Sequence, residues 1–153
     1  KSAIFCKSLA EKISEELNNF DLILSPAMGG IVIGYEIGRL LKKEAIFSER
    51  VDGQFKLRRD FKIAKKSKVL IVEDVITTGK SSIECSNLVE TSEAEVVGFA
   101  CLINRSNRRS LTNKKIVSQV EIDIPTYSEN NLPKNLISLP GIKPGSRELK
   151  WAR

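Results

Sequence analysis

The sequence of 153 residues contains no histidine, which limits the chemistry that the chain can carry out. Without an imidazole, neither a Ser-His-Asp nor a Cys-His nucleophilic scheme can be assembled, and the common zinc sites lose their usual nitrogen ligand. Any catalysis therefore has to use carboxylates, lysine and arginine side chains, backbone amides or a hard metal ion.

Cysteine is scarce as well, and long apolar runs are absent. Cys6, Cys85 and Cys101 are an odd number of cysteines at wide spacings, and no CxxC pair occurs, so we expect reduced, buried thiols. No apolar run approaches the roughly 18 residues that a membrane helix needs, and the N-terminus lacks the pattern of a signal peptide. We expect a cytoplasmic protein with no membrane partner.

The length and composition predict one globular domain, and the net charge predicts anionic partners. The chain is 41% hydrophobic and 29% charged, which argues against disorder, collagen and coiled coil. Its length fits one domain, residues 1–153. Lysine and arginine number 25 against 19 acidic residues, and the net charge of +6 favours nucleic acid, an acidic surface or a small phosphorylated ligand.

Apolar spacing predicts strands that alternate with helices. Helices are expected over residues 4–20, 31–41 and 82–90, and strands over 21–26, 45–50, 69–72, 96–103 and, more weakly, 116–125. Strands separated by helices pair in parallel through right-handed crossovers, so the fold class is α/β, a doubly wound, mainly parallel sheet flanked by helices. Proline and glycine predict an irregular tail over residues 126–153.

A basic insertion interrupts this alternation. Asp52 and Gly53 carry a hairpin-turn signal. After them, apolar and mainly basic residues alternate over residues 55–63, which predicts an inserted β-hairpin with one basic face. A solvated basic surface is the alternative interpretation of such a charge run.

The segment over residues 73–81 carries the chemistry. Ligands of open α/β sheets bind beyond the carboxyl ends of the strands, and this segment joins a buried strand to a helix. Its hydroxyls, its backbone amides and the positive end of the following helix suit a phosphate group. The preceding acid pair suits sugar hydroxyls or a divalent metal ion, so a sugar phosphate fits both halves. The alternative is a purely structural turn that caps the helix.

Together with the strand before it, this segment forms the sequence VLIVEDVITTGKS over residues 69–81. That sequence resembles the phosphoribosyl-pyrophosphate signature of the type I phosphoribosyltransferases. Within that family the chain is similar to the orotate phosphoribosyltransferases through residues 25–30, 48–53, 55–59 and 143–147. The resemblance covers about residues 9–147. It implies the type I phosphoribosyltransferase fold and, with Mg²⁺, transfer of ribose 5-phosphate from 5-phosphoribosyl 1-pyrophosphate to orotate. The products are orotidine 5′-phosphate and pyrophosphate, a step of de novo pyrimidine (UMP) biosynthesis.

The resemblance also implies roles for individual residues, while the ligands of the metal ion stay open. The residues expected to bind the phosphoribosyl-pyrophosphate donor are Glu73 and Asp74 at the ribose diol, Thr77, Thr78, Gly79, Lys80 and Ser81 at the 5-phosphate, and Ala27, Met28, Gly29 and Arg50 at the pyrophosphate. The residues expected at orotate are Thr77 and Arg105, and those expected to act in catalysis are Asp74, Lys56 and Arg50.

In the family, the basic loop with Lys56, Arg58 and Arg59 is mobile and closes over the site of a neighbouring subunit, which implies a homodimer. Such closure places positive charge at the leaving group and excludes water. The chain departs from the family in two respects. The loop has no histidine, so proton transfer falls to lysine, aspartate or water. Relatives have a longer N-terminal hood region, which we expect to be incomplete in this sequence, with residues 4–7 as its remnant.

Three alternative functions remain, and each differs from orotate phosphoribosyl transfer in what it binds or converts. A purine phosphoribosyltransferase would use adenine or hypoxanthine instead of orotate, and a non-catalytic regulator would bind the same donor without turnover. Nucleic-acid binding would account for the net charge but would leave the acid pair unexplained, because carboxylates repel phosphodiesters. No helix-turn-helix pattern occurs, and we expect no nucleic-acid partner.

Overall fold

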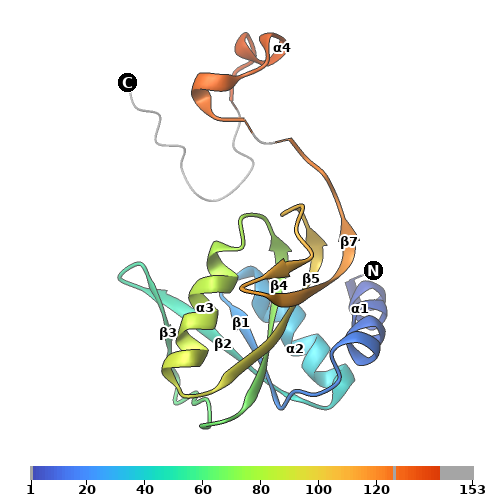
Figure 1. The fold of residues 1–153 in the computed structure, drawn as a ribbon, viewed down its shortest axis with the longest axis vertical. Helices are drawn as coiled ribbons and strands as arrows, with labels where there is room; N and C mark the ends of the chain where they lie inside the picture. Colours follow the sequence, from blue (N-terminus) through green and yellow to red (C-terminus); the bar gives the residue numbers. More distant parts are fainter. Residues whose placement is uncertain (1, 126, 142–153) are drawn as a thin grey trace. The chain divides into compact units, whose positions relative to one another are not determined.

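The computed structural model of the chain describes residues 2–125 and 127–141 (Figure 1). Two compact units are present, Lys1–Asp123 and Ile124–Arg153. The second unit contains, in its described part, a short 3-10 helix (Glu129–Asn131) and α4 (Lys134–Ile137). The motif over residues 143–147 lies outside the described residues, and the single domain over residues 1–153 stays a prediction.

The first unit is built on a seven-stranded sheet with the order β3-β2-β1-β4-β5-β7-β6. Strands β2, β1, β4, β5 and β7 pair in parallel, and the short strands β3 and β6 are antiparallel edges. The expected mainly parallel sheet is therefore confirmed. The strands are β1 (Leu22–Pro26), β2 (Glu44–Val51), β3 (Gln54–Leu57), β4 (Lys68–Ile76), β5 (Glu95–Asn104), β6 (Ser110–Leu111) and β7 (Lys114–Glu121).

Helices cover both faces of this sheet, which makes the fold doubly wound. Helices α1 (Ser2–Glu16) and α2 (Gly29–Leu41) pack on one face, where Leu9 and Ile37 belong to the same buried cluster as Leu70 and Val72 of β4. Helix α3 (Lys80–Thr91) packs on the other. Each fully buried leucine or isoleucine stabilises the fold by roughly 1.5–3 kcal/mol.

The basic hairpin forms, but it is shorter than predicted. Asp52 and Gly53 both have positive φ, 52° and 82°, the conformation that suits a two-residue turn between twisted antiparallel strands. The second strand ends at Leu57, because Arg59 and Asp60 also adopt positive φ and break the alternation. The strand predicted to continue to residue 63 is thus wrong beyond residue 57.

Candidate active site

The acid pair lies inside β4, where a turn was expected. The strand continues to Ile76, and consecutive side chains of a strand point to opposite faces. Glu73 therefore lies on the α3 side of the sheet and Asp74 on the α2 side. The two carboxylates are not directed at one point, as the sequence led us to expect.

Glu73 is buried, with 8% of its surface exposed. Its carboxylate accepts a hydrogen bond from the hydroxyl of Ser82 in the first turn of α3. Burial raises the pKa of Glu73 to about 7, the Ser82 hydrogen bond opposes that rise, and the charge of Asp74 adds to it. Glu73 thus connects the sheet to the start of α3.

The cysteines near Glu73 are inert. Cys101 lies beside it on β5, and Cys85 follows Ser82 by one helical turn. Burial raises the pKa of each thiol to about 12, so both stay protonated at neutral pH. All three cysteines of the chain are free and buried, as predicted.

Asp74 is half-buried, and its carboxylate lies against Gly29 in the turn that joins β1 to α2. This turn holds Ala27, Met28 and Gly29, and the Ala27–Met28 peptide bond is cis. The backbone amide of Ala27 donates to the carbonyl of Ser48 at 2.8 Å, which ties the turn to β2. Met28 is exposed, and the first amides of α2 have no partner within their own helix. The turn can therefore receive an anion.

A second turn of the same kind joins β4 to α3. Gly79 precedes the helix with a φ of 75°, which a residue with a side chain rarely adopts. The Thr78 hydroxyl accepts a hydrogen bond from the Lys80 amide at 3.3 Å. Thr77, Thr78 and Lys80 are exposed and Ser81 is half-buried. The predicted phosphate-binding residues thus share one turn at a helix N-terminus.

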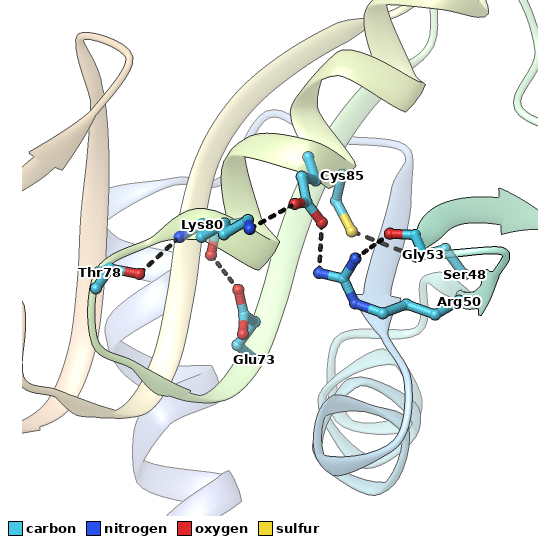
Figure 2. A network of polar contacts seen from close by, with 9 residues as sticks. Ser48, Arg50, Gly53, Glu73, Thr78, Lys80 and Cys85 are labelled. Carbon is cyan, nitrogen blue, oxygen red and sulfur yellow. Dashed lines mark hydrogen bonds and ion pairs between the residues drawn. The ribbon is translucent and has the colours of Figure 1, made fainter. Parts of the chain in front are cut away.

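Arg50 is tied to the start of α3 (Figure 2). Its Nη2 lies 2.5 Å from Oε2 of Glu84, and its Nη1 donates to the carbonyl of Gly53 at 2.6 Å. Its guanidinium also stacks over the Phe55 ring at 4.2 Å. The other carboxylate oxygen of Glu84 lies 3.9 Å from Nζ of Lys80. Sequence patterns did not reveal Glu84, which connects two of the predicted site residues.

The three cations of the predicted mobile loop differ in their surroundings. Arg58 and Arg59 both reach Glu49 on β2, at 3.4 and 2.7 Å. Lys56 lies on β3 and is exposed. Among these three, Lys56 is therefore the one whose charge is directed to solvent rather than to Glu49.

Arg105 begins the loop after β5, next to the end of β4. Its backbone amide donates to the carbonyl of Ile76 at 2.7 Å, which places it beside Thr77. Its Nε is buried with no hydrogen-bond partner in the described part of the chain. Asn104 is buried and shapes the loop, because its amide donates to the carbonyl of Arg108 at 2.8 Å. A polar ligand at this place would satisfy Arg105.

No three metal-ligating side chains gather into a cation site within residues 2–125 and 127–141. Asp74 is partly exposed, and its carboxylate lies against Gly29, so it could share a hard cation with the oxygens of a bound ligand. In the same described part of the chain, no helix is long and apolar enough to cross a membrane.

The sequence matches one protein family and its curated relatives. The family model "Phosphoribosyl transferase domain" matches residues 1–133. The chain is 47% identical over 145 residues to an orotate phosphoribosyltransferase of Parvibaculum lavamentivorans, covering 94% of this chain and 75% of the relative. It is 48% identical over 145 residues to that of Methylorubrum populi, covering 94% and 74%.

Solved structures share the fold. Orotate phosphoribosyltransferase from Aeropyrum pernix superposes with a TM-score of 0.67 at 18% identity, over 79% of this chain and 71% of that chain. Adenine phosphoribosyltransferase from Thermoanaerobacter pseudethanolicus gives the same TM-score at 20% identity, over 78% and 79%. At these identities the likeness establishes the type I phosphoribosyltransferase fold and leaves the acceptor base open.

Proposed function

The chain belongs to the orotate phosphoribosyltransferase family, and from that premise we propose that it transfers ribose 5-phosphate from 5-phosphoribosyl 1-pyrophosphate to N1 of orotate. The products are orotidine 5′-phosphate and pyrophosphate, a step of UMP synthesis. One observation carries the proposal. Strands β1 and β4 are parallel neighbours, and each ends in a turn that opens a helix. The Asp74 carboxylate lies against Gly29 of the first turn, and Asp74 precedes the second turn by three residues on the same strand. The donor has this pattern, with a phosphate and a pyrophosphate on either side of a diol.

The donor-binding roles follow from this placement. Residues 77–81 hold the 5-phosphate, because their amides and hydroxyls lie at the positive end of α3. The turn over residues 27–29 holds the pyrophosphate with Arg50. Asp74 accepts hydrogen bonds from the ribose hydroxyls. Glu73 supports the 5-phosphate turn through Ser82, a role we prefer to direct contact with the diol, since its carboxylate lies on the other face of the sheet.

Orotate lies between Thr77 and Arg105 in this proposal. Its carboxylate and ring carbonyl present a planar pair of acceptors, which a guanidinium group matches with parallel N–H donors. The buried Nε of Arg105 supports this assignment, because it has no hydrogen-bond partner among the described residues.

Breaking the bond between C1 of ribose and the pyrophosphate builds positive charge on the sugar and negative charge on the leaving group. Arg50 and Lys56 supply compensating positive charge at the leaving group, and closure of the hairpin removes water that would hydrolyse the donor. Charge-assisted hydrogen bonds contribute roughly 1.5–3 kcal/mol each, so two or three of them are a substantial share of the catalysis.

Mg²⁺ fits this site. Asp74 would hold the ion together with oxygens of the bound donor, since Mg²⁺ commonly uses one or two carboxylates together with substrate phosphates. Bound there, the ion would supply positive charge that offsets the negative charge on the leaving pyrophosphate. Asp74 keeps its position through a hydrogen bond from the Val75 amide to its Oδ1, at 2.9 Å.

We also propose a homodimer in the cytoplasm. An apolar groove of about 360 Å³ lies over α2, β2 and the loop after β3, and its lining includes Val32 and Tyr35, which are 68% and 67% exposed. A second copy covering this groove would lie close to both the pyrophosphate turn and the basic hairpin. The free, buried thiols suit a reducing compartment.

A spectrophotometric assay of orotate consumption tests the function. The full chain with the donor and Mg²⁺ should consume orotate, and Asp74→Asn should lose most of this activity. The matched control is Asp21→Asn, because Asp21 accepts a hydrogen bond from the Lys68 amide at the opposite end of the sheet, which asparagine can retain. Activity with adenine or hypoxanthine and none with orotate would contradict the proposal.

A further inference from the structure

Glu84 lies between two positive groups that the proposed function assigns to anion binding. Its Oε2 lies 2.5 Å from Nη2 of Arg50, and its Oε1 lies 3.9 Å from Nζ of Lys80 (Figure 2). The carboxylate belongs to the second turn of α3. It thus joins the β2–β3 hairpin to the phosphate turn across 34 positions of sequence.

Arg50 is held at three places, only one of which is Glu84. Its Nη1 donates to the Gly53 carbonyl, and its guanidinium carbon lies 4.2 Å from the centroid of the Phe55 ring. Neither contact depends on the hydrogen bond that Nη2 donates to Glu84. The Nη2 group can therefore exchange Glu84 for another anion while the rest of the side chain stays in place. The side chains of Arg50 and Glu84 are 35% and 29% exposed, so an incoming anion can reach both.

We propose that Glu84 is the resting counter-ion of the pyrophosphate site, a positioning residue that keeps Arg50 and Lys80 in place until the pyrophosphate group of the donor displaces it. This inference rests on the proposed function, because it assumes that Arg50 binds pyrophosphate. Glu84 itself contacts neither sugar nor base.

The physical basis is competition between two anions for the same cations. Without a ligand, the carboxylate offsets the repulsion between Arg50 and Lys80 and satisfies donors that would otherwise lack a partner. Pyrophosphate carries more charge and more acceptor oxygens than one carboxylate, so it takes over Arg50 at the cost of breaking the ion pair. Without the Glu84 carboxylate, pyrophosphate no longer has to break an ion pair to reach Arg50. It also no longer lies near a negative charge that repels it.

Calorimetric titration with Mg²⁺ and inorganic pyrophosphate tests the inference on the full chain. Glu84→Gln should bind pyrophosphate about fivefold more tightly than the wild type, the size expected for loss of a partly exposed ion pair. Glu90→Gln removes the same charge from an exposed position of the same helix and should leave the affinity unchanged. In steady-state kinetics, the KM for the donor should fall in Glu84→Gln while the KM for orotate stays constant.

A second pair of variants isolates the contact. In an Arg50→Ala background, Glu84→Gln should have a smaller effect than in the wild type, because only the longer contact to Lys80 remains. Glu84→Asp keeps the charge with a shorter side chain and should give an intermediate affinity, and melting curves show whether each variant folds.

The outcomes separate this inference from the proposed function. Equal or weaker pyrophosphate binding by Glu84→Gln, with normal orotate consumption by the wild type, overturns the counter-ion role and leaves the function intact. Tighter binding by Glu84→Gln in a chain that never consumes orotate supports the counter-ion role and removes the function. A wild type that binds no pyrophosphate overturns the counter-ion role as well.

Discussion

The carboxylate of Asp74 lies directly against the α-carbon of Gly29. A Cβ atom built on Gly29 would stand 2.1 Å from Oδ2 of Asp74, well inside van der Waals contact. The pyrophosphate turn and the proposed diol acid therefore come together only because residue 29 has no side chain. This contact joins the ends of β1 and β4, which the sheet already holds side by side.

Gly29→Ala should reduce the catalytic activity far more than the stability of the fold. The methyl group would meet the carboxyl end of the Asp74 side chain, so Asp74 has to rotate away and lose the hydrogen bond from the Val75 amide, at a cost to folding of roughly 0.5–1.5 kcal/mol. We expect kcat/KM for the donor to fall roughly tenfold or more, because Asp74 no longer faces the sugar. Steady-state kinetics and a thermal melt measure the two effects.

Asp74→Asn serves as the reference for that variant. If Gly29→Ala acts by displacing Asp74, the double variant should lose little more activity than Asp74→Asn alone, since both changes remove one interaction. Fully additive losses would show instead that the methyl group blocks the pyrophosphate turn itself.

Arg105→Ala should weaken orotate binding selectively. The Arg105 side chain carries a buried donor next to the first residue of the phosphate turn, and a lost charge-assisted hydrogen bond costs roughly 1.5–3 kcal/mol. We expect the KM for orotate to rise about 10- to 100-fold and the KM for the donor to change little. Arg108→Ala, in the same loop but exposed, is the matched control. A parallel rise in both KM values would contradict the assignment.

The repeating patterns of the sequence were sufficient to predict the architecture. Apolar runs such as residues 69–72 are buried on both faces of a parallel sheet, and the helix-forming segments between them cover it. Boundaries were less predictable, because polar residues also occupy strand ends. The extension of β4 to Ile76 places Glu73 and Asp74 on opposite faces, which a turn beginning at residue 73 would not do.

Contacts between distant segments could not be predicted. Glu84 occupies an unremarkable helical position, and it reaches Arg50 only because α3 packs over β1 and the β2–β3 hairpin. In the same way, Arg58 and Arg59 appeared as free loop cations in the sequence, whereas both pair with Glu49 across the hairpin. Pairing of this kind depends on strand register, which a single sequence specifies weakly.

The raised pKa of Glu73 predicts how stability depends on pH. The folded state binds the proton more tightly than the unfolded chain does, with a pKa of about 7 against 4.5. The contribution of this carboxyl to the free energy of unfolding is therefore complete below about pH 4.5 and is lost as pH rises through 7. The largest loss is about 3 kcal/mol.

Glu73→Gln should remove this pH dependence while keeping an acceptor for Ser82. Urea unfolding between pH 5 and 8, without divalent cations, should show the wild type losing stability relative to the variant as pH rises. Glu44→Gln, at an exposed position of β2, is the control and should follow the wild type. Parallel curves for Glu73→Gln and the wild type would contradict the burial of an ionisable carboxyl.

Mixing two inactive variants tests whether the hairpin acts on a partner subunit. Lys56→Ala should lose mainly kcat, because Lys56 is exposed and, unlike Arg58 and Arg59, is not paired with Glu49. Asp74→Asn should lose donor binding. If Lys56 serves the partner's site, a hybrid dimer contains one site with both residues intact. Co-expression of the two variants should then restore about a quarter of the wild-type activity, since half of the dimers are hybrids and each has one intact site. Hybrids isolated through two different affinity tags that remain inactive would place Lys56 at the site of its own chain.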